Sequence, residues 1–198
     1  IAVFFDGEVV HTDSIPVGGV HVTNDIARGL STPLDHAERM KTLYGSTLPS
    51  PSDDREVIKV HMIGDDADSD VSQVPRSMLV GIIKPRMEEI FEMVRARLEA
   101  AGFDKVAGRR VVLTGGACQL PGVQELAGMI LGKQVRMGRP KGYSGLAEAV
   151  TGPAFSTCLG LLNYALNKPI DSHKGTYRPE EEPNSRIGKF GHWIREYF

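Results

Sequence analysis

The chain has 198 residues, of which 41% are hydrophobic and 24% are charged, so it is long enough to bury a core as one or two domains. Its net charge of −2 gives no electrostatic reason to expect nucleic acid as a partner. The two cysteines, without CxxC spacing or a Cys/His cluster, argue against a structural zinc site and a disulfide scaffold, and no apolar run approaches the roughly 20 residues of a spanning helix.

The first thirty residues indicate a hairpin followed by a short helix. Residues 1–5 are a continuous apolar run, Asp6 and Gly7 form a hairpin signal, and residues 8–15 resume with strand-like side chains. After a proline and two paired glycines, the apolar spacing over 20–30 predicts a short helix. Because the chain begins without Met and directly on a strand, we expect it to be a piece of a longer protein.

Residues 31–83 differ in character and are predicted to form a smaller unit. A compact helix is expected with Asp35 as its N-cap, Glu38 completing a capping box and Gly45 as its stop. Residues 56–63 predict a strand, and the acidic stretch GDDADSDVSQ that follows is interpreted as a surface turn or linker.

The longest helix signal lies in the middle of the chain. Its apolar residues recur at helical spacing and are Ile83, Met87, Ile90, Phe91, Val94 and Leu98. Gly102 closes the run, and Pro85 either begins its regular part or kinks it.

The following segments alternate between strand and helix. RRVVLTGG is typical of a buried strand and a glycine turn, and residues 123–131 of a helix. Residues 134–137 predict another short strand, and residues 154–166 a strongly apolar helix. This order predicts an α/β layer fold with a smaller inserted subdomain.

The last thirty residues have two parts. Residues 167–185 are polar, carry three prolines and show no periodicity, so we interpret them as a disordered tether. Wound as a helix, residues 186–198 separate an apolar face from a mostly basic one. The apolar face holds Ile187, Phe190, Trp193, Ile194, Tyr197 and Phe198, and the other face holds Lys189 and Arg195. We predict an amphipathic helix that lies on a lipid surface, with docking onto protein as the alternative.

Two loose signals could carry ligand chemistry. Gly115 and Gly116 follow a buried strand, where glycine lets the backbone approach a flat ligand, and a plain strand-to-helix turn is the alternative. Glu38 and Lys41 project to the same side of their helix and could present a carboxylate and an ammonium to a nucleoside. A capping residue and a solvated lysine are the plain interpretation of that pair. No nucleophile motif and no GxxxxGK[ST] phosphate loop occurs in the sequence.

Four stretches stand in a distinctive order: AERMKTLYG, SMLVGIIKPRMEEIFEMV, LTGGACQLPG and AFSTCLGLLNYAL, followed by the tether and the terminal helix. This order closely resembles the C-terminal half of the FtsA family of bacterial, actin-like cell-division proteins. The resemblance implies an RNase H-like subdomain of the actin type over 1–30 and 84–166, with an inserted smaller α/β subdomain over 31–83. It also implies a flexible linker over 167–185 and a membrane-targeting amphipathic helix over 186–198.

The resemblance implies that this half of the protein holds the adenosine side of ATP. By position, Glu38 and Lys41 would meet the ribose and the adenine. The adenosine moiety would pack against Gly115, Gly116 and Ala117. The family's phosphate-binding and Mg²⁺-organising residues lie upstream of this sequence, so ATP and Mg²⁺ would be held fully only in a full-length protein, with at most weak ATPase activity.

The resemblance also implies partners. The family's inserted subdomain receives the C-terminal peptide of the tubulin-like ring protein FtsZ, and the basic residues in the matching region are Arg76, Lys84 and Arg86. Self-polymerisation, downstream divisome proteins and membrane lipid are implied as further partners. The implied location is the cytoplasmic face of the inner membrane at the division septum.

Two alternatives stay open at this point. One is an enzyme of the same superfamily, such as a sugar kinase or an Hsp70-type chaperone ATPase, and the other is a pilus-assembly or shape-determining actin relative. The amphipathic tail distinguishes a membrane-tethering scaffold from both alternatives. The enzymes do not need a terminal helix on a flexible tether, and the other actin relatives would not place an anchor at this end. We therefore favour a scaffold that tethers the FtsZ ring to the membrane.

Overall fold

A computed structural model describes residues 1–64, 71–103, 108–141, 147 and 150–167. The chain separates into two units, Ile1–Gly160 and Leu161–Phe198, and the described part of the second unit is 161–167. Within the described residues the strands form three two-stranded sheets, and no helix is long and apolar enough to span a bilayer. Both segments beyond residue 167, the expected tether and the expected terminal helix, lie outside the described residues.

The chain begins with the predicted antiparallel hairpin, β1 (Ala2–Phe5) and β2 (Glu8–Thr12). Asp6 and Gly7 have φ angles of 48° and 87°, the positive values that a tight two-residue hairpin turn requires. Most apolar side chains of this hairpin are exposed, for example Phe4 at 62%. The antiparallel pairing and the two positive φ angles confirm the hairpin prediction from the Asp-Gly pair.

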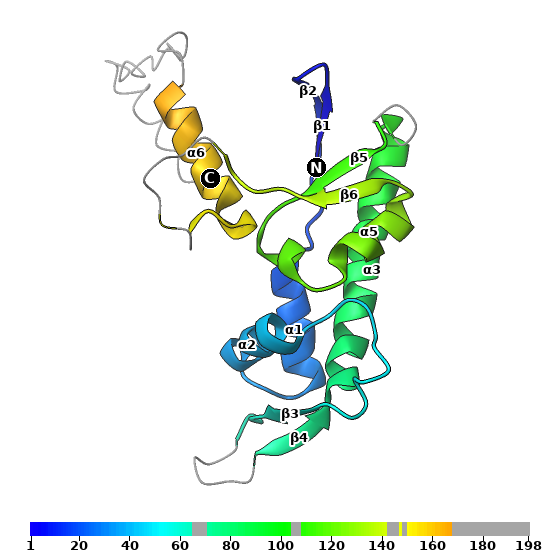
Figure 1. Cartoon of the computed structure of the whole chain (residues 1–198), viewed down its shortest axis with the longest axis vertical. Helices are drawn as coiled ribbons and strands as arrows, with labels where there is room; N and C mark the ends of the chain where they lie inside the picture. The colour runs from blue at the N-terminus through cyan, green and yellow to red at the C-terminus, as the bar shows by residue number, and fades with distance from the viewer. Residues whose placement is uncertain (65–70, 104–107, 142–146, 148–149, 168–198) are drawn as a thin grey trace, which may run out of the picture. The chain divides into compact units, whose positions relative to one another are not determined.

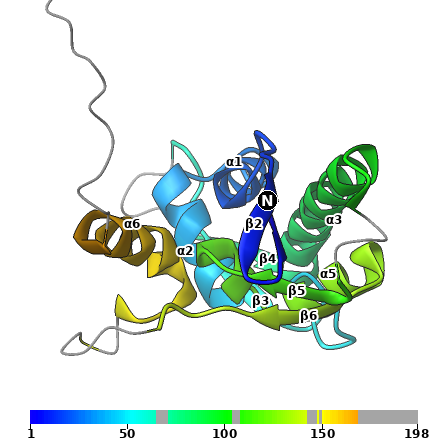
Figure 2. The ribbon, with the colours of Figure 1, turned by 90° about the horizontal axis from the view of Figure 1, so that it is seen from above.

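Three helices enclose much of the buried core. They are α1 (Gly19–Gly29), α2 (Leu34–Tyr44) and α3 (Arg76–Ala100). α1 packs against both α2 and α3, and Figures 1 and 2 show α1 and α3 side by side. Their contacts are made by fully buried apolar side chains such as Val22, Ile26 and Ile83.

α3 starts earlier than the sequence indicates and runs without interruption past Pro85. The expected subdomain boundary between residues 83 and 84 therefore falls inside one helix. Its buried stripe includes Leu79, Ile83, Met87 and Phe91, at the i, i+4, i+8 and i+12 spacing of a helix face. α3 contacts α1, α2, α5 and β4, so it connects the core to both ends of the unit.

A second antiparallel pair lies at the N-terminal end of α3. It consists of β3 (Val57–Val60) and β4 (Ser72–Pro75), with Val57 opposite Pro75. The prediction of β3 is confirmed, whereas the interpretation of GDDADSDVSQ as a turn is wrong at its end, because Ser72 and Gln73 belong to β4. Pairing with β3 supplies the backbone hydrogen bonds that make this polar stretch a strand.

The third sheet is the parallel pair β5 (Arg110–Leu113) and β6 (Gln134–Met137). The crossover between them contains the 3₁₀ turn η1 (Gly116–Gln119) and helix α5 (Val123–Leu131), which packs on α3 and β6. After β6 the chain continues to a second 3₁₀ turn, η3 (Pro153–Phe155), and to α6 (Ser156–Asn167). The predicted strand–turn–helix–strand–helix order is confirmed for this region (Figure 1).

Candidate functional site

Gly19, the first residue of α1, is the point at which two sequence-predicted site elements meet. A Cβ atom built on Gly19 would lie 3.0 Å from the Cβ of Ala117 and 3.9 Å from Nζ of Lys41. A side chain at this position would therefore push the turn at 115–117 away from α1. Glycine here lets α1, α2 and the glycine turn converge.

Lys41 of α2 is buried in this junction and uses all three of its N–H donors. Its Nζ lies 2.6 Å from Oε2 of Glu38, 2.8 Å from Oγ1 of Thr23 and 3.2 Å from the carbonyl oxygen of Gly19. An ammonium group has three donors and no acceptor. Lys41 therefore ties α2 to the first turn of α1 and orients Glu38.

Glu38 differs from Lys41 because half of its side chain, 54%, is exposed. Its Oε2 also accepts a hydrogen bond from Oγ1 of Thr23 at 2.5 Å. Partial burial would raise the pKa of Glu38 above its ordinary value of 4.5, but the hydrogen bonds from Lys41 and Thr23 and the Lys41 charge outweigh it and lower the pKa. Glu38 is thus an oriented, ionised acceptor with a free face toward solvent.

The expected capping box at the start of α2 is wrong. The helix begins at Leu34, with Pro33 as its N-cap residue and no side-chain cap. The N–H of Ala37 is bonded to the Pro33 carbonyl at 2.9 Å, which places Asp35 inside the first turn. Glu38 is consequently not engaged at the helix terminus and is available for the junction.

The glycine turn after β5 is fixed from the other side by η3. Gly115 has φ of 95°, a conformation that favours glycine, and its N–H donates to the Pro153 carbonyl at 3.0 Å. At Gly116 the nearest neighbour of an added Cβ atom would be the Cβ of Ala154, at 4.0 Å, so this position has space around it. The structure therefore brings Ala117 and Lys41 to the same point of α1, Gly19, and Gly115 and Gly116 precede Ala117 on the same turn.

The sequence interpretation misses Gly19 and Thr23. It treats the Gly18-Gly19 pair only as a break before a helix. Gly18 is the N-cap of α1, so Gly19, the first residue of the helix, is not needed for capping. The second glycine is therefore the one sign in the sequence that another segment approaches the backbone closely at this point. The partnership of Thr23 with Glu38 joins two helices and leaves no pattern in the sequence.

The three basic residues expected to bind a partner do not form one cluster. Arg76 is engaged internally: its Nε donates to the Tyr44 carbonyl at 2.8 Å, and its Nη1 lies 2.8 Å from Asp53 and 3.2 Å from Glu56. Asp53 is only 2% exposed, so this ion pair holds the turn that contains Asp53 against the start of α3. The bond to the Tyr44 carbonyl holds the end of α2 at the same place.

Arg86 and Lys84 differ in how firmly they are held. Arg86 is paired with Asp25 of α1 through two nitrogens and with Glu89 on its own helix. Lys84 lines a cavity of about 350 Å³ between the 49–54 segment and α3, and its Nζ lies 3.7 Å from Oε1 of Glu88. Lys84 is therefore the least committed of the three cations.

Mg²⁺ has no evident ligand set in this part of the protein. Among the described residues there is no group of three His, Cys, Asp or Glu side chains that could hold a metal ion. Cys118 is buried, and burial raises the pKa of its thiol, which favours the unreactive protonated form.

Comparison with solved structures defines the class of fold. The chain matches a structure described as "Crystal structure of MreB5 of Spiroplasma citri bound to ADP" with a TM-score of 0.57 and 16% sequence identity, over 84% of this chain and 49% of that chain. The fold is therefore that of an actin-like protein.

Comparison of sequences gives the family. The sequence model described as "Cell division protein FtsA" matches residues 1–160. FtsA of Rhizobium meliloti is 44% identical across this whole chain and 45% of its own length, FtsA of Pseudomonas aeruginosa 36% across 48% of its length, and FtsA of Escherichia coli 30% across 48% of its length. The chain belongs to the FtsA family of cell-division proteins. It spans about half the length of the curated relatives it matches.

Proposed function

We propose that this chain is the C-terminal half of an ATP-binding scaffold that tethers the FtsZ ring to the cytoplasmic membrane and assembles other division proteins there. The observation that carries the proposal is the junction at Gly19, where the helix with Glu38 and Lys41 meets the glycine turn. Two elements 74 or more residues apart, picked out from the sequence as nucleoside contacts, lie together in an actin-like fold. Family membership favours this scaffold over a sugar kinase or a chaperone ATPase.

In the proposed site Glu38 contacts the nucleoside directly. Its exposed, ionised carboxylate accepts hydrogen bonds from ribose hydroxyls, while Lys41 holds it in place from the buried side. The backbone of Gly115 and Gly116 packs against the flat base, because neither carries a side chain and the space at Gly116 is open. The ADP bound to MreB5 of Spiroplasma citri supports a nucleotide of this kind. Upstream residues would supply the phosphate and Mg²⁺ contacts.

The proposed partner surface is the cavity beside Lys84, which would receive the acidic C-terminal peptide of FtsZ. Three carboxylates of the described residues line this cavity: Asp53 is paired with Arg76, Glu88 lies near Lys84 itself, and Asp54 is exposed to solvent. An incoming carboxylate would compete with Glu88 for Lys84 at modest cost, because both side chains are 39% exposed.

The membrane anchor is proposed from the sequence alone, since residues 186–198 lie outside the described part. Trp193 and Tyr197 suit the interface, and Lys189 and Arg195 would meet anionic headgroups. A single such helix binds weakly and reversibly, so self-polymerisation would raise the membrane affinity by presenting many tails to one surface.

The test of the nucleotide site uses a chimera in which the upstream part of Rhizobium meliloti FtsA precedes Ile1. Gly116→Val should weaken ATP binding at least about tenfold, because a branched side chain would occupy the proposed base position. The added Cβ itself has room, since its nearest neighbour would be 4.0 Å away, and an unchanged unfolding curve would verify that the fold is intact. The matched control is Gly108→Val, at an exposed glycine with no neighbour within 4 Å. Equal ATP affinity in both variants would overturn the assignment.

A further inference from the structure

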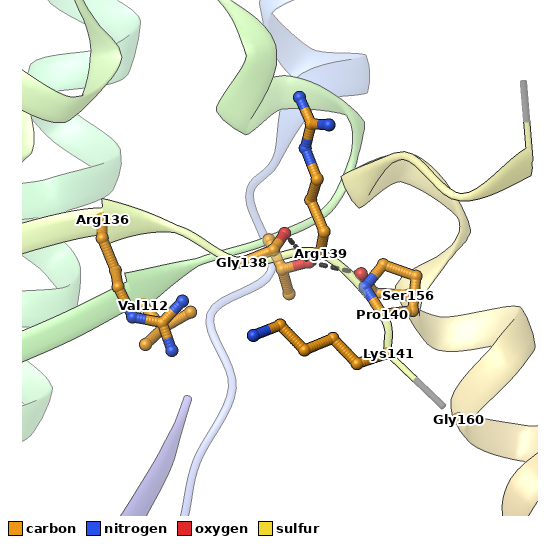
Figure 3. Close-up of a pocket in the computed structure, with 9 residues that line it drawn as sticks. Val112, Arg136, Gly138, Arg139, Pro140, Lys141, Ser156 and Gly160 are labelled. Atoms are coloured by element: carbon orange, nitrogen blue, oxygen red, sulfur yellow. Dashed lines mark hydrogen bonds between the residues drawn. The ribbon is translucent and has the colours of Figure 1, made fainter. Parts of the chain in front are cut away.

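A second cavity, of about 440 Å³, lies on one face of the β5–β6 sheet and is not part of the proposed nucleotide or partner surfaces. Its lining residues are Val112, Thr114, Arg136, Gly138, Arg139, Pro140, Lys141, Ser156 and Gly160. Val112 lies opposite Arg136 in the parallel register, so these two side chains point to the same face of the sheet. Figure 3 shows both directed to one side of the ribbon.

The backbone from which the basic side chains of this cavity extend is held in place by the close packing of β6 on β5 at Gly138. A Cβ atom on Gly138 would lie 2.5 Å from a methyl carbon of Val112, and the Gly138 N–H donates to the Leu113 carbonyl at 2.7 Å. Glycine therefore allows the end of β6 to close onto β5. In Figure 3 the end groups of Arg136 and Lys141 point into a common space, whereas Arg139 extends in another direction.

The charge in this cavity is not neutralised by the residues that the structure describes. No ion pair among them involves Arg136, Arg139 or Lys141, and Arg136 donates only to the neighbouring carbonyl of Met137, at 3.4 Å. Residues 109–167 contain six Lys or Arg and only two Glu, although the whole chain carries a net charge of −2. In the described part of the chain, the lining of the cavity itself holds three cations and no carboxylate.

The cavity also offers neutral donors. Oγ1 of Thr114 lies 2.6 Å from Oγ of Ser156, and 3.3 and 3.4 Å from the carbonyl oxygens of Gly138 and Pro153. When Thr114 gives its single proton to Ser156, the closest of these acceptors, the Ser156 proton is available to a bound anion. Ser156 is the first residue of α6, and its backbone N–H is bonded to the Pro153 carbonyl, so its hydroxyl is the group that it can offer to an anion. Gly160, one turn further on, has no atom within 4 Å of a built Cβ and leaves that side of the cavity open.

We propose that this cavity binds a phosphate group, with Arg136 and Lys141 as the charged contacts and Ser156 as a hydroxyl donor. Arg and Lys side chains and a hydroxyl are groups that recognise phosphate oxygens in proteins. The volume is in the range of small-molecule sites, so it accommodates a diphosphate or the headgroup of a phospholipid. The site is separate from the junction at Gly19, whose cation Lys41 is fully engaged.

The first experiment titrates the 198-residue chain with inorganic pyrophosphate at low ionic strength by calorimetry. Arg136→Gln combined with Lys141→Gln should weaken binding at least about tenfold, equivalent to about 1.4 kcal/mol. The matched control, Arg28→Gln combined with Arg55→Gln, removes the same charge from exposed positions elsewhere and should change affinity less than about twofold. Gly160→Leu fills the cavity without changing charge, raises helix propensity and should also weaken binding.

The second experiment separates the two sources of phosphate. The same variants are sedimented with vesicles of phosphatidylglycerol and phosphatidylcholine, and because all of them keep residues 186–198, any difference between them comes from the cavity. If the cavity variant, Arg136→Gln combined with Lys141→Gln, loses pyrophosphate binding, the ligand of the cavity is a free phosphate anion. If it loses vesicle binding alone, the ligand is a lipid headgroup. Equal behaviour of cavity variant and control in both assays would overturn the proposal. So would an equal loss of pyrophosphate affinity in Lys41→Met, which would place the phosphate at the nucleotide junction.

Discussion

Replacing Lys41 with Met tests the junction at Gly19 most directly. Methionine is unbranched and similar in length, so it fills the space of the lysine stem while removing the ammonium group. The change eliminates contacts to Glu38, Thr23 and the Gly19 carbonyl. Thr23 remains within 3.2 Å of that carbonyl and within 2.5 Å of Glu38, so no polar group is left without a neighbour.

The expected loss of stability follows from these contacts. A hydrogen bond to a charged group contributes about 1.5–3 kcal/mol, but Glu38 is 54% exposed and its ion pair is screened by water. Removing a nearly buried ammonium also relieves its desolvation penalty. We therefore expect Lys41→Met to lower the free energy of unfolding by about 1–2 kcal/mol, or the melting temperature by about 2–8 °C.

Urea unfolding at pH 7 and at pH 3 measures this effect. The lowered pKa of Glu38 contributes stability that is present above its ordinary value of 4.5 and is lost as the pH falls through the folded-state pKa. The difference between wild type and Lys41→Met should therefore shrink below pH 4.5. The control is Lys84→Met, the same substitution at a side chain that is 39% exposed and whose ion pair spans 3.7 Å, which should cost less than about 0.5 kcal/mol. Equal losses in the two variants, or a Lys41→Met difference unchanged at pH 3, would refute this account of the junction.

Three further predictions concern other parts of the chain. Gly138→Ala places a Cβ atom 2.5 Å from a methyl carbon of β5 and should lower the melting temperature by about 4 °C or more, whereas Gly160→Ala should not lower it; equal melting temperatures would contradict the close approach of the two strands. Lys84→Glu should weaken binding of the FtsZ C-terminal peptide severalfold and reduce its salt sensitivity, and Lys59→Glu, at an exposed position of β3, should not; an unchanged affinity would place the peptide elsewhere. Trp193→Glu should release the chain from anionic vesicles without changing its unfolding curve, and undiminished co-sedimentation would exclude the anchor.

Local chemistry accounts for the elements that the sequence predicts well. The Asp6-Gly7 pair specifies a turn by itself, because few residues other than Gly, Asn and Asp accept positive φ at both positions. The apolar stripe of α3 and the VVL run of β5 are similarly direct, since their spacing follows from the geometry of one element. These features depend on neighbours in the chain rather than on distant contacts.

The features that the sequence does not predict depend on distant contacts. β4 is a strand only because it pairs with β3. Glu38 has the spacing of a capping box, and its true partner in α1 is 15 residues away. Gly19 is needed because of Ala117, which is 98 positions away in the sequence. Such requirements are visible only once the chain is folded.

α2 connects two of the proposed sites, so a variant that tests the partner surface must leave this helix in place. Its middle carries Glu38 and Lys41 in the junction, and the carbonyl of its last residue, Tyr44, accepts a hydrogen bond from Arg76. Removing Arg76 would release that end of α2 and leave Asp53, which is 2% exposed, without its ion pair. Lost peptide binding in an Arg76 variant would therefore not separate a direct contact from a displaced helix. The Lys84 side chain has no bond to α2 among the described contacts, so a loss of peptide binding in its variant reports on the surface itself.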